Sequence, residues 1–243
     1  MRILILAAAL LAATPAMADD TFAVVSVGTD YMSRGTSQTF GDPAVTIYAE
    51  HSFDNGFYIA GFTANVDFDD DKTFYDGTKL EADVFAGYRG SVGKVNYDVG
   101  LAAITYYGTK PLPGFNPKGN WNMVEAKVKV NTTFKKTTVG ATVGVTPDYF
   151  NNYGPSIWTE ATVSQVIDDK FTISGAFGRQ QYFRASEGGF PAKLSNYNTW
   201  NVGVTYNITP TLSVDARYHD NDTVVDLGAI YKPVGVVTLR KVL

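Results

Sequence analysis

Apolar and polar side chains alternate with a period of two along most of the chain, and residues 44–68 show this pattern most fully. Two alternating segments, 44–53 and 57–68, are separated by Asn55-Gly56. A period of two places each set of side chains on one face of a strand, and Asn-Gly supplies the positive φ angles of a tight hairpin turn. We assign the set from Val45 to Phe53 and the set from Tyr58 to Phe68 to the apolar face.

Ten further segments alternate in the same way, which predicts twelve strands. These segments lie within residues 21–31, 80–89, 95–103, 124–131, 139–145, 157–167, 171–178, 199–208, 212–218 and 235–243. Short connections at 54–56, 90–94, 133–136, 168–170 and 209–211 alternate with mostly longer ones at 33–42, 69–77, 108–120, 150–154, 185–195 and 221–233. The last loop contains an apolar patch, Val224 to Tyr231, for which strand and loop both remain open.

An even strand number with short turns at one end and long loops at the other is typical of outer-membrane barrels. The predicted fold class is therefore all-β: a single transmembrane antiparallel up-and-down β-barrel of about 12 strands, with short periplasmic turns and long extracellular loops. Aromatic residues near both strand ends, for example Tyr107 and Tyr149 at one end and Tyr58 and Phe171 at the other, resemble interfacial girdles.

The N-terminus predicts export. Arg2, an apolar run at 3–13 and Ala16-Met17-Ala18 fit a secretory signal peptide, residues 1–18, that is cleaved after Ala18. Residues 19–243 then form the barrel. The chain has no cysteine, and its 24 acidic residues exceed its 20 Lys and Arg, which argues against a nucleic-acid partner. No later apolar run reaches the ~18 residues of a membrane-spanning helix.

Residues 30–39, DYMSRGTSQT, and the GDPA turn that follows resemble the start of the TorF porin family, small outer-membrane barrels of proteobacteria. The matching residues are Tyr31, Arg34, Gly35, Ser37, Gln38, Thr39, Gly41, Asp42, Pro43, Ala44, Gly56, Phe57 and Tyr58, with further matches at 80–90 and 95–101. The resemblance implies an outer-membrane barrel. Such barrels usually end in Phe, whereas this chain ends in Leu243.

If the apolar set faces lipid, the polar set lines the lumen. The predicted lumen residues are Glu50, Asp67, Glu81, Asp83, Arg89, Asp98, Glu125, Lys127, Lys129, Glu160, Asp215 and Arg217, with His219 as a further candidate. Rings of such charges set the ion preference of a pore, and the slight acid excess predicts weak cation preference or little selectivity. A closed interior held by salt bridges is the alternative.

The first loop carries the motif of Tyr31, Arg34, Gly35, Ser37 and Gln38. Arg34 could reach into the lumen and pair with Asp30 or another acid, or it could organise its own turn. Acidic residues at 67–76 form a possible Ca²⁺ site, but Lys72 stands where an EF-hand loop needs Gly, and we predict no metal and no cofactor. His51 and His219 lie at opposite strand ends, so we predict no catalytic site.

The sequence therefore predicts passive diffusion of small polar solutes or ions through the outer membrane. The expected partners are outer-membrane lipid and lipopolysaccharide, those solutes, and the barrel-assembly machinery during insertion. Two alternatives remain: a non-conducting barrel with a structural or surface-interaction role, and a soluble periplasmic barrel with its apolar set inside.

Overall fold

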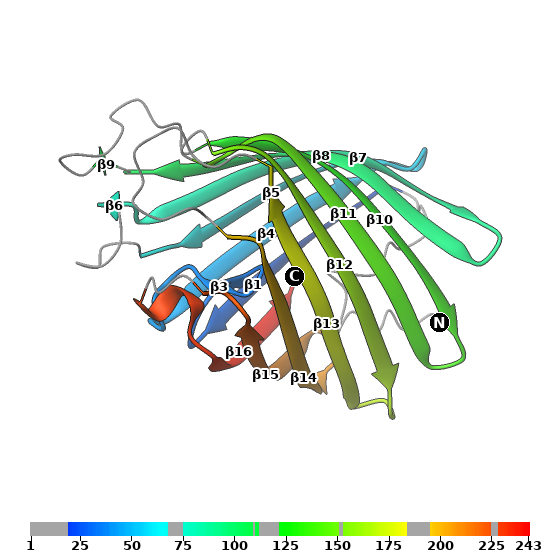
Figure 1. The fold of residues 1–243 in the computed structure, drawn as a ribbon. Helices are drawn as coiled ribbons and strands as arrows, with labels where there is room; N and C mark the ends of the chain where they lie inside the picture. Colours follow the sequence, from blue (N-terminus) through cyan, green and yellow to red (C-terminus); the bar gives the residue numbers. More distant parts are fainter. Residues whose placement is uncertain are drawn as a thin grey trace.

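The computed structural model describes residues 19–67, 75–108, 110–111, 122–150, 153–183, 195–224 and 228–243, which form one closed antiparallel barrel (Figure 1). Its twelve strands are β1 (Asp20–Gly28), β4 (Ala44–Ser52), β5 (Phe57–Asn65), β7 (Leu80–Val92), β8 (Val95–Tyr107), β10 (Met123–Phe134), β11 (Thr137–Tyr149), β12 (Gly154–Val166), β13 (Phe171–Tyr182), β14 (Tyr197–Thr209), β15 (Leu212–Asn221) and β16 (Val234–Val242). Each pairs with its neighbours in sequence, and β1 closes the barrel on β16. The prediction of a twelve-stranded antiparallel barrel is confirmed.

Smaller elements lie in the longer connections. They are β2 (Met32–Ser33) paired with β3 (Thr36–Ser37), β6 (Tyr75–Asp76) paired with β9 (Lys110–Pro111), and the 3-10 helix η2 (Gly228–Tyr231). The described part of the apolar patch at 224–231 is thus η2, preceded by the exposed Val224, and not a thirteenth strand. No helix among the described residues is long and apolar enough to cross a membrane.

The short turns follow the predicted chemistry. Gly56 has a φ of +92°, and Lys135 and Gly93 also have positive φ, which tight hairpin turns require. The β7–β8 turn is shorter than the predicted 90–94, because both strands continue to Val92 and Val95. In the β12–β13 turn the backbone N–H groups of Lys170 and Phe171 donate to Asp168, and these bonds hold the pKa of Asp168 below its usual range.

The outer wall of the barrel is apolar. Its exposed side chains include Val27, Ile47, Val84, Leu101, Val128, Val143, Val163, Ile173, Val202 and Leu239, with exposed fractions between 42% and 65%. Polar side chains such as Glu50 and Glu125 are buried on the opposite, inward parity. A soluble barrel needs the reverse arrangement, so the alternative with the apolar set inside is wrong.

The face assignment of β5 is a correction. Phe57 and Ile59 are more than half exposed, whereas Tyr58, Ala60 and Ala64 are buried. The set predicted to meet lipid therefore points inward. The reason is local, because Phe62 packs against Tyr31 of the first loop, with ring centroids 5.7 Å apart. In this part of the barrel the first loop fills the interior, and the inward face of β5 is apolar where the loop packs against it.

The predicted aromatic girdles are right only in part. Tyr107, Trp200 and Tyr218 are exposed near the long loops, and Tyr88 and Phe171 near the short turns. Other aromatic residues at the long-loop ends lie in an interior cluster, in which Tyr149 contacts Phe150 and Tyr182. At the other end, the inward Tyr58 is a second exception.

The outer face of the C-terminal strand is apolar except for one cation. Val237, Leu239 and Leu243 are exposed on the same parity as Lys241. The Lys241 ammonium donates to the Thr211 hydroxyl, in the neighbouring short turn, at 2.7 Å. The charge thus lies at the short-turn end of the barrel, away from the middle of its apolar wall.

Candidate functional site

The first long loop places a small hairpin inside the barrel. Arg34 and Gly35 form its tip, with φ angles of 50° and 77°, and two positive φ values fit a type I′ turn. The loop is tied to its own base, because the hydroxyls of Ser37 and Thr39 donate to Asp30 Oδ1 at 2.7 and 2.8 Å. The sequence motif therefore builds a preformed turn on a rigid base.

Arg34 anchors this β2–β3 hairpin to the far wall. Its Nη2 donates to Oε1 and Oε2 of Glu125 on β10 at 2.7 and 2.5 Å. The guanidinium also lies 5.3 Å from the ring centroid of Trp158 on β12. Glu125 and Trp158 are only 1% and 4% exposed. The expectation that Arg34 pairs with an acid of the lumen is thus met by Glu125, while Asp30 serves the loop base.

The backbone of the tip is held as well. Tyr197 Oη donates to the Arg34 carbonyl at 3.1 Å, and Asn221 Nδ2 donates to the Gly35 carbonyl at 3.2 Å. A Cβ on Gly35 would collide with the Thr199 side chain. Only glycine fits here, because the turn demands positive φ and the wall lies against the backbone.

A second group of charges surrounds Arg89 on β7. Its Nη1 and Nη2 donate to the two oxygens of Glu50 at 2.5 and 2.8 Å, and its Nε donates to Asp98 at 3.0 Å. The guanidinium lies 3.8 Å from the ring centroid of Tyr58, whose hydroxyl donates to Asp98 at 2.9 Å. Three predicted lumen residues are therefore joined in one interior network.

The facing side of the barrel holds a third network, around Arg217 on β15. Its Nε and Nη2 donate to Asp215 at 3.0 and 3.1 Å, its Nη1 to Asn201 Oδ1 at 2.7 Å, and its Nη2 also to Ser174 Oγ at 2.7 Å. These contacts cross three strands. The positive charge of Arg217 is thereby paired with Asp215.

Four further predicted lumen residues lie on β7 and β10 and differ in their contacts. Glu81 and Asp83 are buried on β7, with Asp83 accepting from the Thr105 backbone N–H at 3.2 Å. Lys127 and Lys129 lie on the inward parity of β10. The Lys127 ammonium lies 5.4 Å from the ring centroid of Phe85.

The prediction that Asp67 lines the lumen is wrong, for the same reason as the face assignment of β5. Asp67 lies beyond the end of that strand, its side chain is 37% exposed, and it pairs with Lys79 at 2.6 Å. It is therefore a rim residue and does not belong to the interior charges. Of the acidic cluster, Asp69, Asp70 and Asp71 lie outside the described residues. Within the described chain no group of three or more His, Cys, Asp or Glu side chains could hold a metal ion.

Glycines on the inward parity let large side chains lie flat against the wall. A Cβ on Gly87 would come within 2.6 Å of the Tyr58 ring, and a Cβ on Gly144 within 2.7 Å of the Glu125 carboxylate. Gly178 gives the same room to Trp158. The bulky interior groups thus fold along the wall instead of crossing the lumen.

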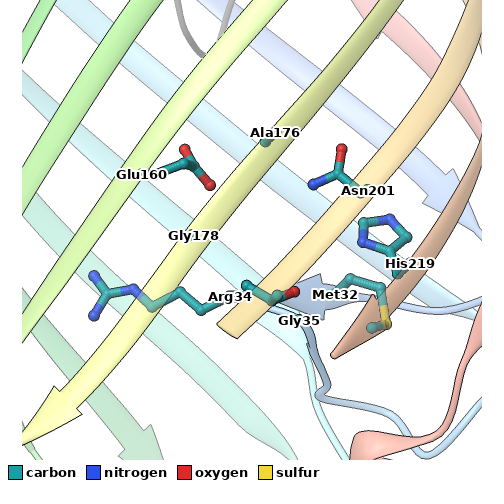
Figure 2. A pocket seen from close by; sticks show the side chains of 9 residues that line it. Met32, Arg34, Gly35, Glu160, Ala176, Gly178, Asn201 and His219 are labelled. Carbon is teal, nitrogen blue, oxygen red and sulfur yellow. The ribbon is translucent and has the colours of Figure 1, made fainter. Parts of the chain in front are cut away.

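A cavity of about 140 Å³ remains between the hairpin tip and strands β12 to β15. Figure 2 shows the Glu160 carboxylate, the Asn201 amide and the His219 ring around this space, with Met32, Arg34 and Gly35 of the hairpin below. The ionisable groups among these residues are Arg34, Glu160 and His219. Arg34 of the sequence motif and the predicted lumen residue Glu160 thus line the same cavity.

Sequence reasoning missed some interior residues. Asn201 is not among the predicted lumen residues, although it accepts a hydrogen bond from Arg217 and lines the cavity. Arg240 lies on the inward parity of β16 and was not predicted, because Lys241 beside it obscured the alternation. The signal that could have found Arg240 is its parity, which is opposite to that of the apolar Val237 and Leu239.

Comparisons with known proteins agree with this architecture. A family model described as "Bacterial protein of unknown function (Gcw_chp)" matches residues 12–239. A comparison with curated proteins gives no match.

Several solved structures share the fold. They include the KdgM porin (TM-score 0.57, 10% identity, 90% of this chain and 98% of that chain covered) and the NanC porin (0.55, 12%, 90% and 98%). The CymD monoaromatic hydrocarbon channel is also similar (0.51, 9%, 93% and 87%). At such low identity these likenesses show a shared fold.

Proposed function

We propose that this chain, which belongs to the Gcw_chp family of bacterial proteins of unknown function, is an outer-membrane porin through which small polar solutes or ions diffuse. The observation that carries the proposal is the distribution of side chains across the barrel wall. Valine, leucine and isoleucine are exposed outside, while ionisable groups line the inside. The resemblance of residues 30–44 to the TorF porin family supports the same function.

The outer wall fits contact with lipid. In a membrane every backbone polar group must be satisfied internally, and a closed barrel does this. The partners of the apolar wall would be outer-membrane lipid and, on the side of the long loops, lipopolysaccharide. Export through a cleaved signal peptide at residues 1–18 and insertion by the assembly machinery belong to the same proposal.

The interior fits the passage of polar solutes. Side chains that face inward or are inserted with the first loop include eight acids, Asp30, Glu50, Glu81, Asp83, Asp98, Glu125, Glu160 and Asp215, and six bases, Arg34, Arg89, Lys127, Lys129, Arg217 and Arg240. Glu81 and Asp83 are joined by a side-chain hydrogen bond, which requires one shared proton, so the balance is one negative charge. Fixed charges of one sign favour counter-ions in a pore, so weak cation preference follows.

The hairpin sets the width of the passage in this proposal. Arg34 ties the hairpin to Glu125, and beside the hairpin the cavity along β12 to β15 is open to solutes. Twelve strands lie between the eight that side chains fill and the sixteen or more that leave an aqueous channel. An inserted hairpin in a barrel of this size would leave room for small solutes only.

A non-conducting structural barrel is the second candidate. It is favoured by the same hairpin, which links β10, β14 and β15 across the lumen. Liposome swelling separates the two candidates. Vesicles containing the refolded barrel, verified by its faster gel mobility without boiling, should swell in small sugars faster than empty vesicles. Swelling no faster than that of empty vesicles would favour the structural role.

A further inference from the structure

The cavity beside the hairpin is large enough for an organic solute. A water molecule needs roughly 10–15 Å³ of such volume, so a cavity of about 140 Å³ holds on the order of ten waters. A bare ion would leave most of this space unfilled. The size fits a compound of about the bulk of a hexose.

Of the residues that line this cavity, Glu160 is the acid. Arg34, the other charged lining residue, pairs through Nη2 with both oxygens of Glu125. Among the described residues, none donates a hydrogen bond to the Glu160 carboxylate or forms a close ion pair with it. Lys129, Arg34 and Lys127 act on it electrostatically. Lys129, the foremost of these cations, lies on the same row of paired residues, two strands away across Thr142.

The other lining groups offer hydrogen bonds and a small apolar surface. Asn201 accepts from Arg217 with its Oδ1, and its amide nitrogen remains a donor to the cavity. The His219 ring lines the same space as Asn201, its neighbour across the β14–β15 pair. Met32 and Ala176 supply apolar contacts. This set matches hydroxyl groups on a compact carbon skeleton.

We propose that this cavity is a binding subsite for small hydroxylated primary ammonium compounds, with the Glu160 carboxylate as the acceptor for the ammonium group. Charge-assisted hydrogen bonds to a carboxylate are about twice as strong as neutral ones, and the ammonium supplies the donors that the described residues do not offer to Glu160. The hydroxyl groups contact Asn201 and His219. The proposal rests on the proposed porin function for the route by which the solute arrives.

The test compares D-glucosamine with D-glucose, which differ by an ammonium in place of one hydroxyl. Calorimetric titration of the detergent-refolded barrel at about pH 6, where the amine is protonated, should detect glucosamine and show at least tenfold weaker binding of glucose. Glu160→Gln should weaken the binding of glucosamine by about tenfold or more and leave the binding of glucose unchanged. Asp83→Asn, which removes an inward carboxylate on β7, is the matched control and should bind as the unaltered barrel does.

A second variant keeps the carboxylate. Thr142 lies opposite Glu160 across the β11–β12 pair, with a Cβ separation of about 5 Å. Thr142→Lys therefore supplies an internal ammonium that should compete with glucosamine for Glu160. It should weaken the binding of glucosamine about as much as Glu160→Gln does.

The outcomes separate this inference from the porin function. Equal binding of both sugars, or unchanged glucosamine affinity in both Glu160→Gln and Thr142→Lys, overturns the subsite even if the barrel conducts. The expected calorimetric pattern in a barrel that gives no ion current supports the subsite and contradicts the porin function.

Discussion

Removal of the Arg34 side chain should release the β2–β3 hairpin and widen the passage. Arg34→Ala removes the charge-assisted hydrogen bonds to Glu125, worth about 1.5–3 kcal/mol, and the contact with Trp158, worth about 0.5–2 kcal/mol. Since Arg34 and Glu125 are 19% and 2% exposed, solvent screening reduces these values little. A loss of about 3 kcal/mol changes the ratio of inserted to released hairpin about a hundredfold.

Single-channel recording in planar bilayers measures this shift. Arg34→Ala should give a larger and noisier conductance than the unaltered barrel. Glu125→Gln should give the same change, and the double variant should add little to either, because both single changes remove one interaction. Arg179→Ala is the matched control, since Arg179 bonds Asn198 outside this network. Unchanged conductance in both Arg34→Ala and Glu125→Gln would refute the reasoning.

Three further predictions concern the wall of the barrel. Gly178→Val should drive the Trp158 indole toward the cavity and reduce conductance, whereas Gly235→Ala, whose Cβ would meet nothing within 4 Å, should not; equal conductance of the two would contradict the placement of Trp158. Arg89→Ala leaves the buried Glu50 and Asp98 without a cation, which costs up to about 3–5 kcal/mol, so the unboiled gel band should be lost at a lower temperature than in Arg179→Ala. Val143→Arg places a charge on the outer wall at a cost of about 2–4 kcal/mol near the bilayer midplane and should impair refolding into vesicles. Thr142→Arg, one residue earlier and on the inward face, should refold. If Thr142→Arg failed to refold and Val143→Arg refolded, lipid would contact the face assigned here to the interior.

The fold was predictable because the barrel imposes one simple pattern on eleven of its strands. Each strand must present apolar side chains outward and polar ones inward, so a period of two recurs. Trp158, which shares the parity of the predicted lumen residue Glu160, follows the same pattern and is buried on the inward face.

β5 was misassigned for a physical reason. The rule of a polar interior assumes that water fills the lumen, but part of the first loop packs against this strand through Tyr31 and Phe62. Apolar side chains are therefore stable on both faces of β5. The position of Asp67 was wrong for the same reason, because it was read from the parity of Tyr58.

The site was predictable only as a set of residue types. That Arg34 enters the lumen could be suspected from its motif, but its partner lies 91 residues further along the chain. Such a pairing depends on the loop conformation and on the room that Gly144 leaves for Glu125. The cavity, with Asn201 and His219, has Met32, Arg34 and Gly35 of the hairpin as one of its sides, so it too depends on the loop conformation.

The most direct test of the account is a single-channel recording of the refolded barrel under a potassium chloride gradient. The account predicts discrete conductance steps and a reversal potential of the sign expected for weak cation preference, because the interior acids outnumber the bases. Barrel that is folded by the gel criterion but gives no steps in repeated insertions would contradict it.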